Sequence, residues 1–217
     1  GGYKNCTFGQ TNTIGGGQQN CITGSLHVIA GGNANCIKGL AYGFVGGGLQ
    51  NDIFSNYWGT IGGGRQNIIH SASSNASTIS GGYCSCIHST FSTIGGGCKN
   101  YVCGARATVA GGGGNCALAA CSTVGGGVFN KACETNSVVV GGCLNCAEGN
   151  CTTVGGGCGN VASECLSTIA GGKANTASNC YAAIGGGQGN TASGKCSTVG
   201  GGCGNTAECM ATIGGGF

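Results

Sequence analysis

Cysteine is the residue whose abundance in this sequence points most clearly to chemistry, with 19 copies among 217 residues. Equal positions of stacked β repeats lie about 4.8 Å apart, inside the Cα separation that a disulfide requires. The spacing of several cysteines, 15 residues, therefore predicts disulfides between successive repeats of an exposed protein in an oxidising place. The alternative is that Cys serves as a small, reduced, apolar filler. The candidate bridges are Cys6–Cys21 or Cys21–Cys36, Cys143–Cys158 and Cys165–Cys180.

Some Cys and His residues have spacings that resemble those of metal ligands. These are Cys143-x-x-Cys146, Cys84-x-Cys86, and the column of His70, His88 and Cys103, which share one position in three consecutive repeats. A zinc site needs four ligands that converge tetrahedrally, whereas stacked repeats place equal positions in rows. We therefore expect no metal site and no cofactor.

Enzymatic chemistry has few residues available. The sequence has five carboxylates and three His, and no carboxylate falls near both a His and a nucleophile, so a catalytic triad is not indicated. The glycine clusters lack the Lys-Ser/Thr that completes a phosphate-binding loop. The sequence predicts a protein that is not an enzyme.

Composition excludes several further classes. The chain has 52 Gly and no Pro, 6% charged residues and a formal net charge of +3. Interior glycine disfavours helix, collagen requires Pro, and so small a net charge predicts no nucleic-acid partner. No apolar run reaches the length of a membrane span, so none is expected in this segment.

A repeat of about 15 residues accounts for this composition. Each copy contains an Ile or Val anchor, numbered position 0, with Gly at +2 and +3, Asn at +6 in nearly every copy, and Ile, Val or Ala at +8. The anchors are Ile14, Ile29, Val45, Ile61, Ile79, Ile94, Val109, Val124, Val139, Val154, Ile169, Ile184, Val199 and Ile213. Such a short period predicts an all-β parallel β-solenoid of about fourteen coils. We expect one repeat domain over residues 1–217, as a segment of a longer fibre.

Three repeat positions have structural interpretations. Positions 0 and +8 should fill a thin core, thicker where +8 is Ile and slimmer where it is Ala. The +2 glycines Gly126 and Gly186 should not tolerate a Cβ, because the chain turns there. Stacked amides at +6 should form a hydrogen-bonded ladder. Its clearest members are Asn100, Asn115, Asn130, Asn145, Asn160, Asn175, Asn190 and Asn205.

Units such as residues 183–194 (A-I-G-G-G-Q-G-N-T-A-S-G) resemble the YadA-like head repeats of trimeric autotransporter adhesins. Similar Gly/Asn-rich repeats occur in proteins of large DNA viruses. The resemblance covers nearly the whole chain. It implies a left-handed parallel β-roll, three chains that associate side by side, and a head that binds a host surface or matrix.

The expected function is that of a structural fibre or surface appendage that self-associates as a homotrimer or filament. We expect it outside a cell, on a cell surface or on a virion. Two alternatives remain open: an adhesin head that binds a host-surface ligand, and an ice-binding solenoid. Possible glycosylation sites are Asn5, Asn75 and Asn150, each in an Asn-x-Ser/Thr sequence. Exposed aromatics of the early repeats, such as Tyr42 and Trp58, should form either a recognition surface or a contact with sister chains.

Overall fold

The computed structural model describes residues 2–55, 57–71 and 76–217, in which every regular element is a β-strand. Each coil contributes one odd-numbered and one even-numbered strand, and the two sets form separate parallel sheets. The described residues form 28 strands, two to a coil, which matches the expected number of about fourteen coils. The predicted parallel β-solenoid is confirmed. Contacts divide the chain into two compact units, and the single domain over residues 1–217 stays a prediction.

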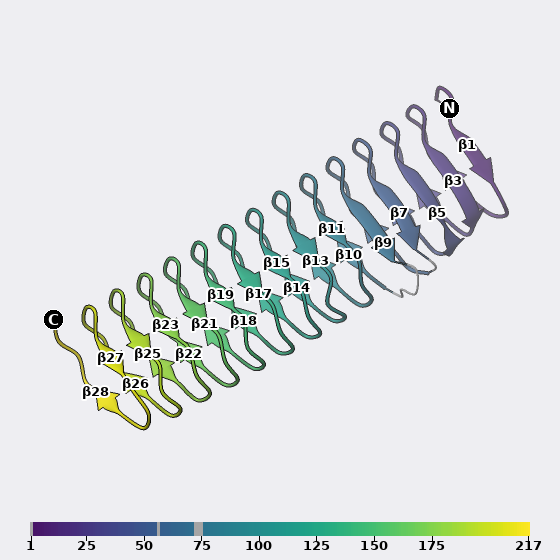
Figure 1. Ribbon diagram of the computed structural model, residues 1–217. Helices are drawn as coiled ribbons and strands as arrows, with labels where there is room; N and C mark the ends of the chain where they lie inside the picture. Colours follow the sequence, from purple (N-terminus) through teal and green to yellow (C-terminus); the bar gives the residue numbers. More distant parts are fainter. Residues whose placement is uncertain (1, 56, 72–75) are drawn as a thin grey trace. The chain divides into compact units, whose positions relative to one another are not determined.

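The first unit comprises Gly1–Arg106 and Ala110–Gly112. Successive coils lie side by side with parallel strands (Figure 1). The odd-numbered strands are longest in the early coils, where β3 has 5 residues and β5 has 6, whereas β11 has 2. The strands are β1 (Cys6–Phe8), β2 (Thr13–Ile14), β3 (Cys21–Ser25), β4 (Val28–Ile29), β5 (Cys36–Ala41), β6 (Phe44–Val45), β7 (Asp52–Ser55), β8 (Thr60–Ile61), β9 (Ile68–Ser71), β10 (Thr78–Ile79), β11 (Cys86–Ile87), β12 (Thr93–Ile94) and β13 (Tyr101–Val102).

The second unit comprises Ala107–Val109 and Gly113–Phe217, and all its strands have 2 residues. Pairing keeps the repeat in register, as in Val154↔Ile169 and Ala162↔Ala177. The strands are β14 (Thr108–Val109), β15 (Cys116–Ala117), β16 (Thr123–Val124), β17 (Lys131–Ala132), β18 (Val138–Val139), β19 (Cys146–Ala147), β20 (Thr153–Val154), β21 (Val161–Ala162), β22 (Thr168–Ile169), β23 (Thr176–Ala177), β24 (Ala183–Ile184), β25 (Thr191–Ala192), β26 (Thr198–Val199), β27 (Thr206–Ala207) and β28 (Thr212–Ile213).

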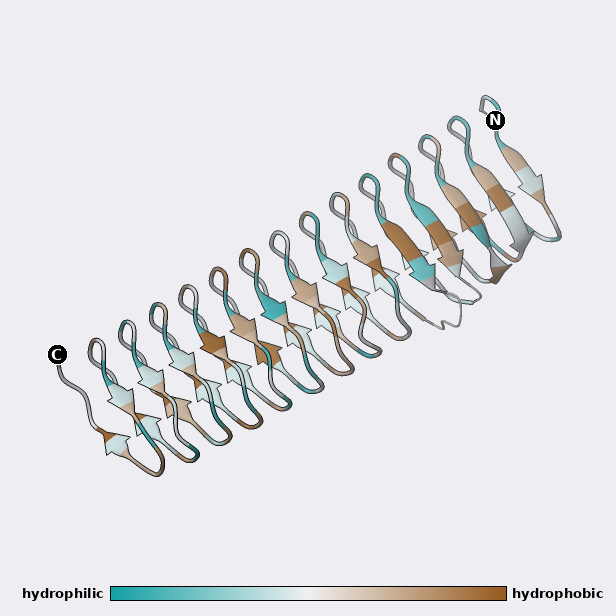
Figure 2. Cartoon of the chain, in the orientation of Figure 1, coloured by the Kyte–Doolittle hydropathy of each residue, from teal (hydrophilic) through white to brown (hydrophobic). Residues whose placement is uncertain are grey.

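The core of each unit consists of the side chains at positions 0 and +8, which point inward from the two sheets. The +8 residue is Ile or Val from Ile22 to Val102 and Ala from Ala117 to Ala207, and all of these have an exposed fraction of 0%. Strand β9 accordingly carries a strongly hydrophobic segment, whereas β25 and β27 are pale (Figure 2). The expected change from large to small core residues is confirmed.

The turn that follows each anchor is most crowded at position +3. Gly127 has a φ of 83°, and a Cβ added there would meet the carbonyl oxygen of Gly142 in the next coil. A Cβ added to Gly126 or Gly186 at +2 meets nothing within 4 Å, but their φ values of 156° and 158° are ones that residues with a side chain rarely adopt. A side chain there is opposed by the backbone conformation rather than by a contact, and the expectation that these two glycines do not tolerate a Cβ stays a prediction.

His27 is an imidazole buried in the first unit, with an exposed fraction of 1%. Its Nδ1 accepts a hydrogen bond of 2.8 Å from the N–H of Gly43, and its Nε2 lies 3.4 Å from the carbonyl oxygen of Gly39. The ring therefore carries its proton on Nε2 and is neutral. Burial lowers the pKa of His27, and the bond to the Gly39 carbonyl opposes this effect in part.

Candidate functional site

The asparagines at position +6 form a buried column within each unit, interrupted in the first unit by Ser85. In the second unit each side chain from Asn130 to Asn190 has an exposed fraction of 0%. Asn160 is typical: its Nδ2 donates to the carbonyls of Gly156 in its own coil and Gly172 in the next, at 2.9 Å each. Its Oδ1 accepts the backbone N–H of Asn175 at 3.0 Å. The column thus fastens the glycine turn of each coil to its neighbours.

Most positions of the column share this geometry. The side chains of Asn100, Asn130, Asn145, Asn175, Asn190 and Asn205 donate to a glycine four residues earlier and to one in the next coil. Asn115 donates to the carbonyl of Gly127. Ser85 replaces Asn in one coil, and its hydroxyl accepts the N–H of Asn100 at 3.4 Å. The column holds the turns in register, which is a structural role.

The first candidate cysteines form a true column on the outer face of the odd-numbered sheet. Cys6 pairs with Cys21, and Cys21 with Cys36, as direct Cα partners of parallel strands. A hydrogen bond with the Cys21 thiol raises the pKa of Cys6, and burial raises that of Cys36. Asp52 follows Cys36 in the same row. The structure thus brings these three thiols into adjacent coils.

The other two candidate pairs also lie on adjacent coils. Cys143 and Cys158 face each other in a parallel bridge at the turn. The carbonyl of Cys165 accepts a hydrogen bond from the N–H of Tyr181, the residue after Cys180. All nineteen cysteines are free thiols in this structure. Disulfides at the candidate positions stay a prediction.

A closer pair of thiols lies where the repeat positions differ. Cys133, at position +9 of one coil, and Cys146, at +7 of the next, have sulfur atoms 3.6 Å apart. Comparison of equal positions cannot find such a pair, because it detects only cysteines in one row. The signal was nonetheless present, since +7 and +9 both point outward from the same sheet and are diagonal neighbours on adjacent strands.

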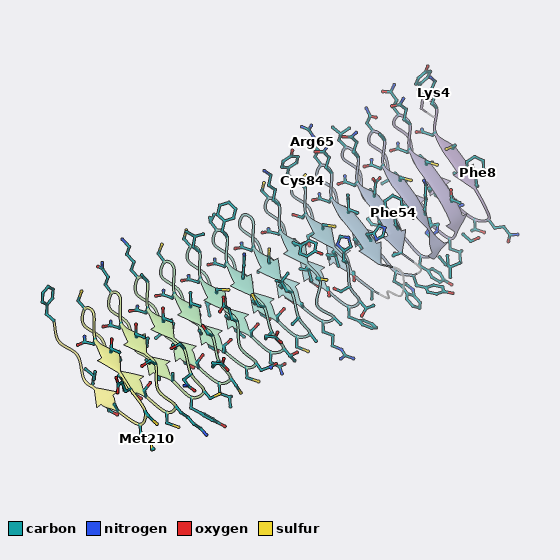
Figure 3. The ribbon with its side chains drawn as sticks, viewed as in Figure 1. Lys4, Phe8, Phe54, Arg65, Cys84 and Met210 are labelled. Atoms are coloured by element: carbon teal, nitrogen blue, oxygen red, sulfur yellow. The ribbon has the colours of Figure 1, made fainter. Side chains whose placement is uncertain are left out.

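His70 and His88 belong to a row of rings rather than to a ligand cluster. Ring centroids are 5.8 Å apart for Phe54 and His70, then 5.4 Å for His70 and His88 and for His88 and Tyr101. Phe54 projects from the outer face of β7 (Figure 3). Among the described residues no three His, Cys, Asp or Glu side chains are grouped so that they could hold a metal ion.

Cys86, whose spacing from Cys84 resembles that of metal ligands, contacts the side chain of a histidine. Cys86 Sγ lies 3.4 Å from Nδ1 of His88. Burial, together with the nearby Cys84, raises the pKa of Cys86 to about 11, so this thiol is protonated at neutral pH.

The outer face of the even-numbered sheet in the second unit carries only uncharged residues with small side chains or none. We call it the threonine face. Its side chains are half-buried or exposed and come from positions −1 and +1. Position −1 contributes Thr108, Thr123, Val138, Thr153, Thr168, Ala183, Thr198 and Thr212, and +1 contributes Gly125, Val140, Gly155, Ala170, Gly185, Gly200 and Gly214.

Two of the three possible glycosylation sites can be placed. Asn150 is exposed. Asn5 begins the asparagine column of the first unit: its Nδ2 donates to the carbonyl of Gly17 and its Oδ1 accepts the N–H of Asn20. Asn75 lies outside the described residues. A glycan on Asn5 would therefore compete with a structural hydrogen bond, whereas one on Asn150 would not.

Comparison with known proteins gives no assignment: the sequence matches no family model and no curated protein. In the described part of the chain, no helix is long and apolar enough to cross a membrane.

Proposed function

We propose that this protein is a structural fibre segment that associates side by side with copies of itself, as a homotrimer or filament, through the threonine face. It would be displayed outside a cell or on a virion surface. The observation that supports the proposal is the uniformity of this face. All the residues of this face are Thr, Gly, Ala or Val, and none is charged.

A face of this composition is suited to close packing against a second copy of the chain. Paired strands set its threonines in register, as in Val138↔Thr153 and Thr153↔Thr168. Small side chains let two sheets approach closely, and the absence of charge removes the repulsion and the desolvation cost that would oppose contact. The core of the second unit contains one Ile or Val per coil, and its other buried apolar residues are all Ala. Burial between chains would add apolar contact to this thin core.

Sedimentation of variants tests the proposal. At micromolar concentration the wild-type protein should sediment as trimers or longer assemblies, and Thr153→Lys combined with Thr168→Lys should shift it to monomer. The matched control is Val161→Lys on the other sheet, where Lys131 already occupies the same repeat position. Circular dichroism establishes that each variant is folded. A monomeric wild type, or equal effects of the lysines on both sheets, would exclude assembly through this face.

The in-register threonine column also supports ice binding as a second candidate function. Against it, the neighbouring outward position is mostly Gly or Ala, so a second threonine column is missing. A monomeric wild type that shows thermal hysteresis in an ice-growth assay would favour this function over the fibre.

An adhesin head remains a third candidate function, and one feature of the first unit favours it. Tyr42 and Trp58 stack with ring centroids 5.7 Å apart and planes inclined by 6°, while 48% and 51% of their surfaces remain exposed. Loss of host-surface binding on Trp58→Ala, with assembly unchanged, would support that function.

A further inference from the structure

The Cys133–Cys146 pair lies on the outer face of the odd-numbered sheet in the second unit. Cys133 follows β17 directly, and its N–H donates to the carbonyl of Ala147 at 2.9 Å. Cys146 begins β19 and is the direct partner of Lys131. Both residues are half-buried on this outward face, and their sulfur atoms are 3.6 Å apart.

The charges around the pair assign different protonation states to the two sulfur atoms. A hydrogen bond from the Cys146 thiol, with a smaller contribution from Lys131, lowers the pKa of Cys133 to about 7 against the opposing effects of burial, Glu148 and Glu134. The same hydrogen bond, burial and Glu148 raise the pKa of Cys146. At neutral pH a large share of Cys133 is therefore thiolate, while Cys146 is held as the thiol that donates to it.

We propose that Cys133 and Cys146 form a thiol–disulfide exchange site, in which Cys133 attacks a low-molecular-weight disulfide and Cys146 resolves the product. This activity lies on a different sheet from the threonine face and does not depend on assembly. The geometry supports it because the nucleophile, the hydrogen-bond donor that activates it and the resolving thiol are adjacent on one accessible face.

The reaction balances in two steps. The Cys133 thiolate attacks one sulfur of R–S–S–R, so a bond forms between Cys133 Sγ and that sulfur, and R–S⁻ leaves and takes a proton from water. Cys146 then gives its proton to the Glu148 carboxylate or to water, attacks Cys133 Sγ and expels the second R–S⁻. The two cysteines are oxidised to one disulfide, and the small disulfide is reduced to two R–SH. The product covalently joins two adjacent coils.

The expected rate follows from thiolate fraction and nucleophilicity. At pH 7 a thiol of pKa about 7 is about half ionised, against about 3% for an ordinary thiol of pKa about 8.5. Its intrinsic nucleophilicity is about fivefold lower, which leaves a net advantage of about threefold. Above pH 9.5 both thiols are largely ionised, and the advantage reverses. Cys133 should therefore react first near neutral pH and fall behind the exposed cysteines at high pH.

The experiment treats the reduced full chain with a small amount of 2-hydroxyethyl disulfide at pH 7 and at pH 9.5. Remaining thiols are blocked at intervals, and peptide mass spectrometry then follows each cysteine. At pH 7 we expect mixed disulfide on Cys133 to appear about threefold faster than the median of the exposed cysteines. It should convert to a Cys133–Cys146 link before Cys143–Cys158 or Cys165–Cys180 forms.

Two variants separate the proposed roles from general accessibility. Cys146→Val copies Val161, which occupies the same repeat position one coil later, and should remove both the rate advantage of Cys133 and the link. The control Cys143→Val copies Val128, which occupies its repeat position one coil earlier, and should leave both unchanged. The proposal is overturned if Cys133 reacts no faster than the exposed cysteines at pH 7, if its rank does not change with pH, or if a mixed disulfide persists without forming the link.

Discussion

Replacement of Asn160 tests the view that the asparagine column holds the coils together. The side chain has two amide hydrogens and one oxygen, and it uses them in hydrogen bonds to Asn145, Gly156, Gly172 and Asn175 at 2.9–3.2 Å. With two hydrogens donated and two bonds accepted, Asn160→Ala removes four bonds at about 1 kcal/mol each. We expect the free energy of unfolding of this region to fall by about 4 kcal/mol.

Two further substitutions at this position should differ from Asn160→Ala in opposite directions, which nonspecific destabilisation would not produce. Asn160→Ser should cost about 1 kcal/mol less than Asn160→Ala, because a serine hydroxyl can accept the N–H of the next coil, as Ser85 does for Asn100. Asn160→Asp should cost more than Asn160→Ala, because its buried carboxylate oxygen would face the carbonyl oxygens of Gly156 and Gly172.

Hydrogen exchange followed by mass spectrometry is the suitable assay, because a solenoid gains its stability locally, from each coil and its neighbours. A loss of about 4 kcal/mol corresponds to about a thousandfold loss of protection in the coils that contain Asn160 and Asn175. Coils remote from the substitution serve as the internal control. A loss below about 1 kcal/mol for Asn160→Ala, or an Asp variant milder than the Ala variant, would refute the reasoning.

Two more predictions concern the turn and a buried base. Gly172→Ala should lower stability by about 2–4 kcal/mol, measured by thermal melting, because φ is 92° there and the new Cβ would meet Gly187. Gly171→Ala, where a Cβ meets nothing within 4 Å, should be close to neutral. Because burial lowers the pKa of His27, unfolding below about pH 6.5 takes up a proton. Stability measured in urea should therefore fall as pH decreases from 6.5, and His27→Asn, which copies Asn12 at the same repeat position, should remove this dependence.

Positions that face the core or the turn could be predicted from the sequence because each admits few residues. An inward position must be apolar in every coil, so Ile, Val and Ala recur at 0 and +8 and reveal the period. The amide at +6 has buried partners above and below, so Asn recurs. Which of two adjacent glycines is crowded could not be predicted, because both are Gly in every coil and only the backbone distinguishes Gly126 from Gly127.

The geometry of the turns and the distances between diagonal neighbours could not be predicted from the repeat either. Leu166 and Tyr181 adopt left-handed φ values of 58° and 61°, which residues other than Gly rarely adopt. Because these turn positions do not carry the expected Gly, the sequence gives no sign of the turn. Hydrogen bonds from their N–H groups to the carbonyls of Asn150 and Cys165 hold them in place. Repeat positions mark Cys133 and Cys146 as diagonal neighbours, but they do not specify how the side chains lean along the strand, which sets the distance between the two sulfur atoms.

Core packing and turn geometry do not restrict the outward-facing positions of the second unit, so the residue types found there bear on function. On the odd-numbered sheet they vary, and Cys116, Lys131, Cys146, Val161 and Thr176 occupy the same position in five coils. On the even-numbered sheet they remain small and uncharged over the whole unit. A face that stays uniform without a folding requirement is what side-by-side packing of identical chains needs, because every coil must meet a similar surface. A varied face suits chemistry at one place, which is where the paired thiols lie. Assembly and thiol exchange can therefore occur on opposite sheets without competing for the same residues.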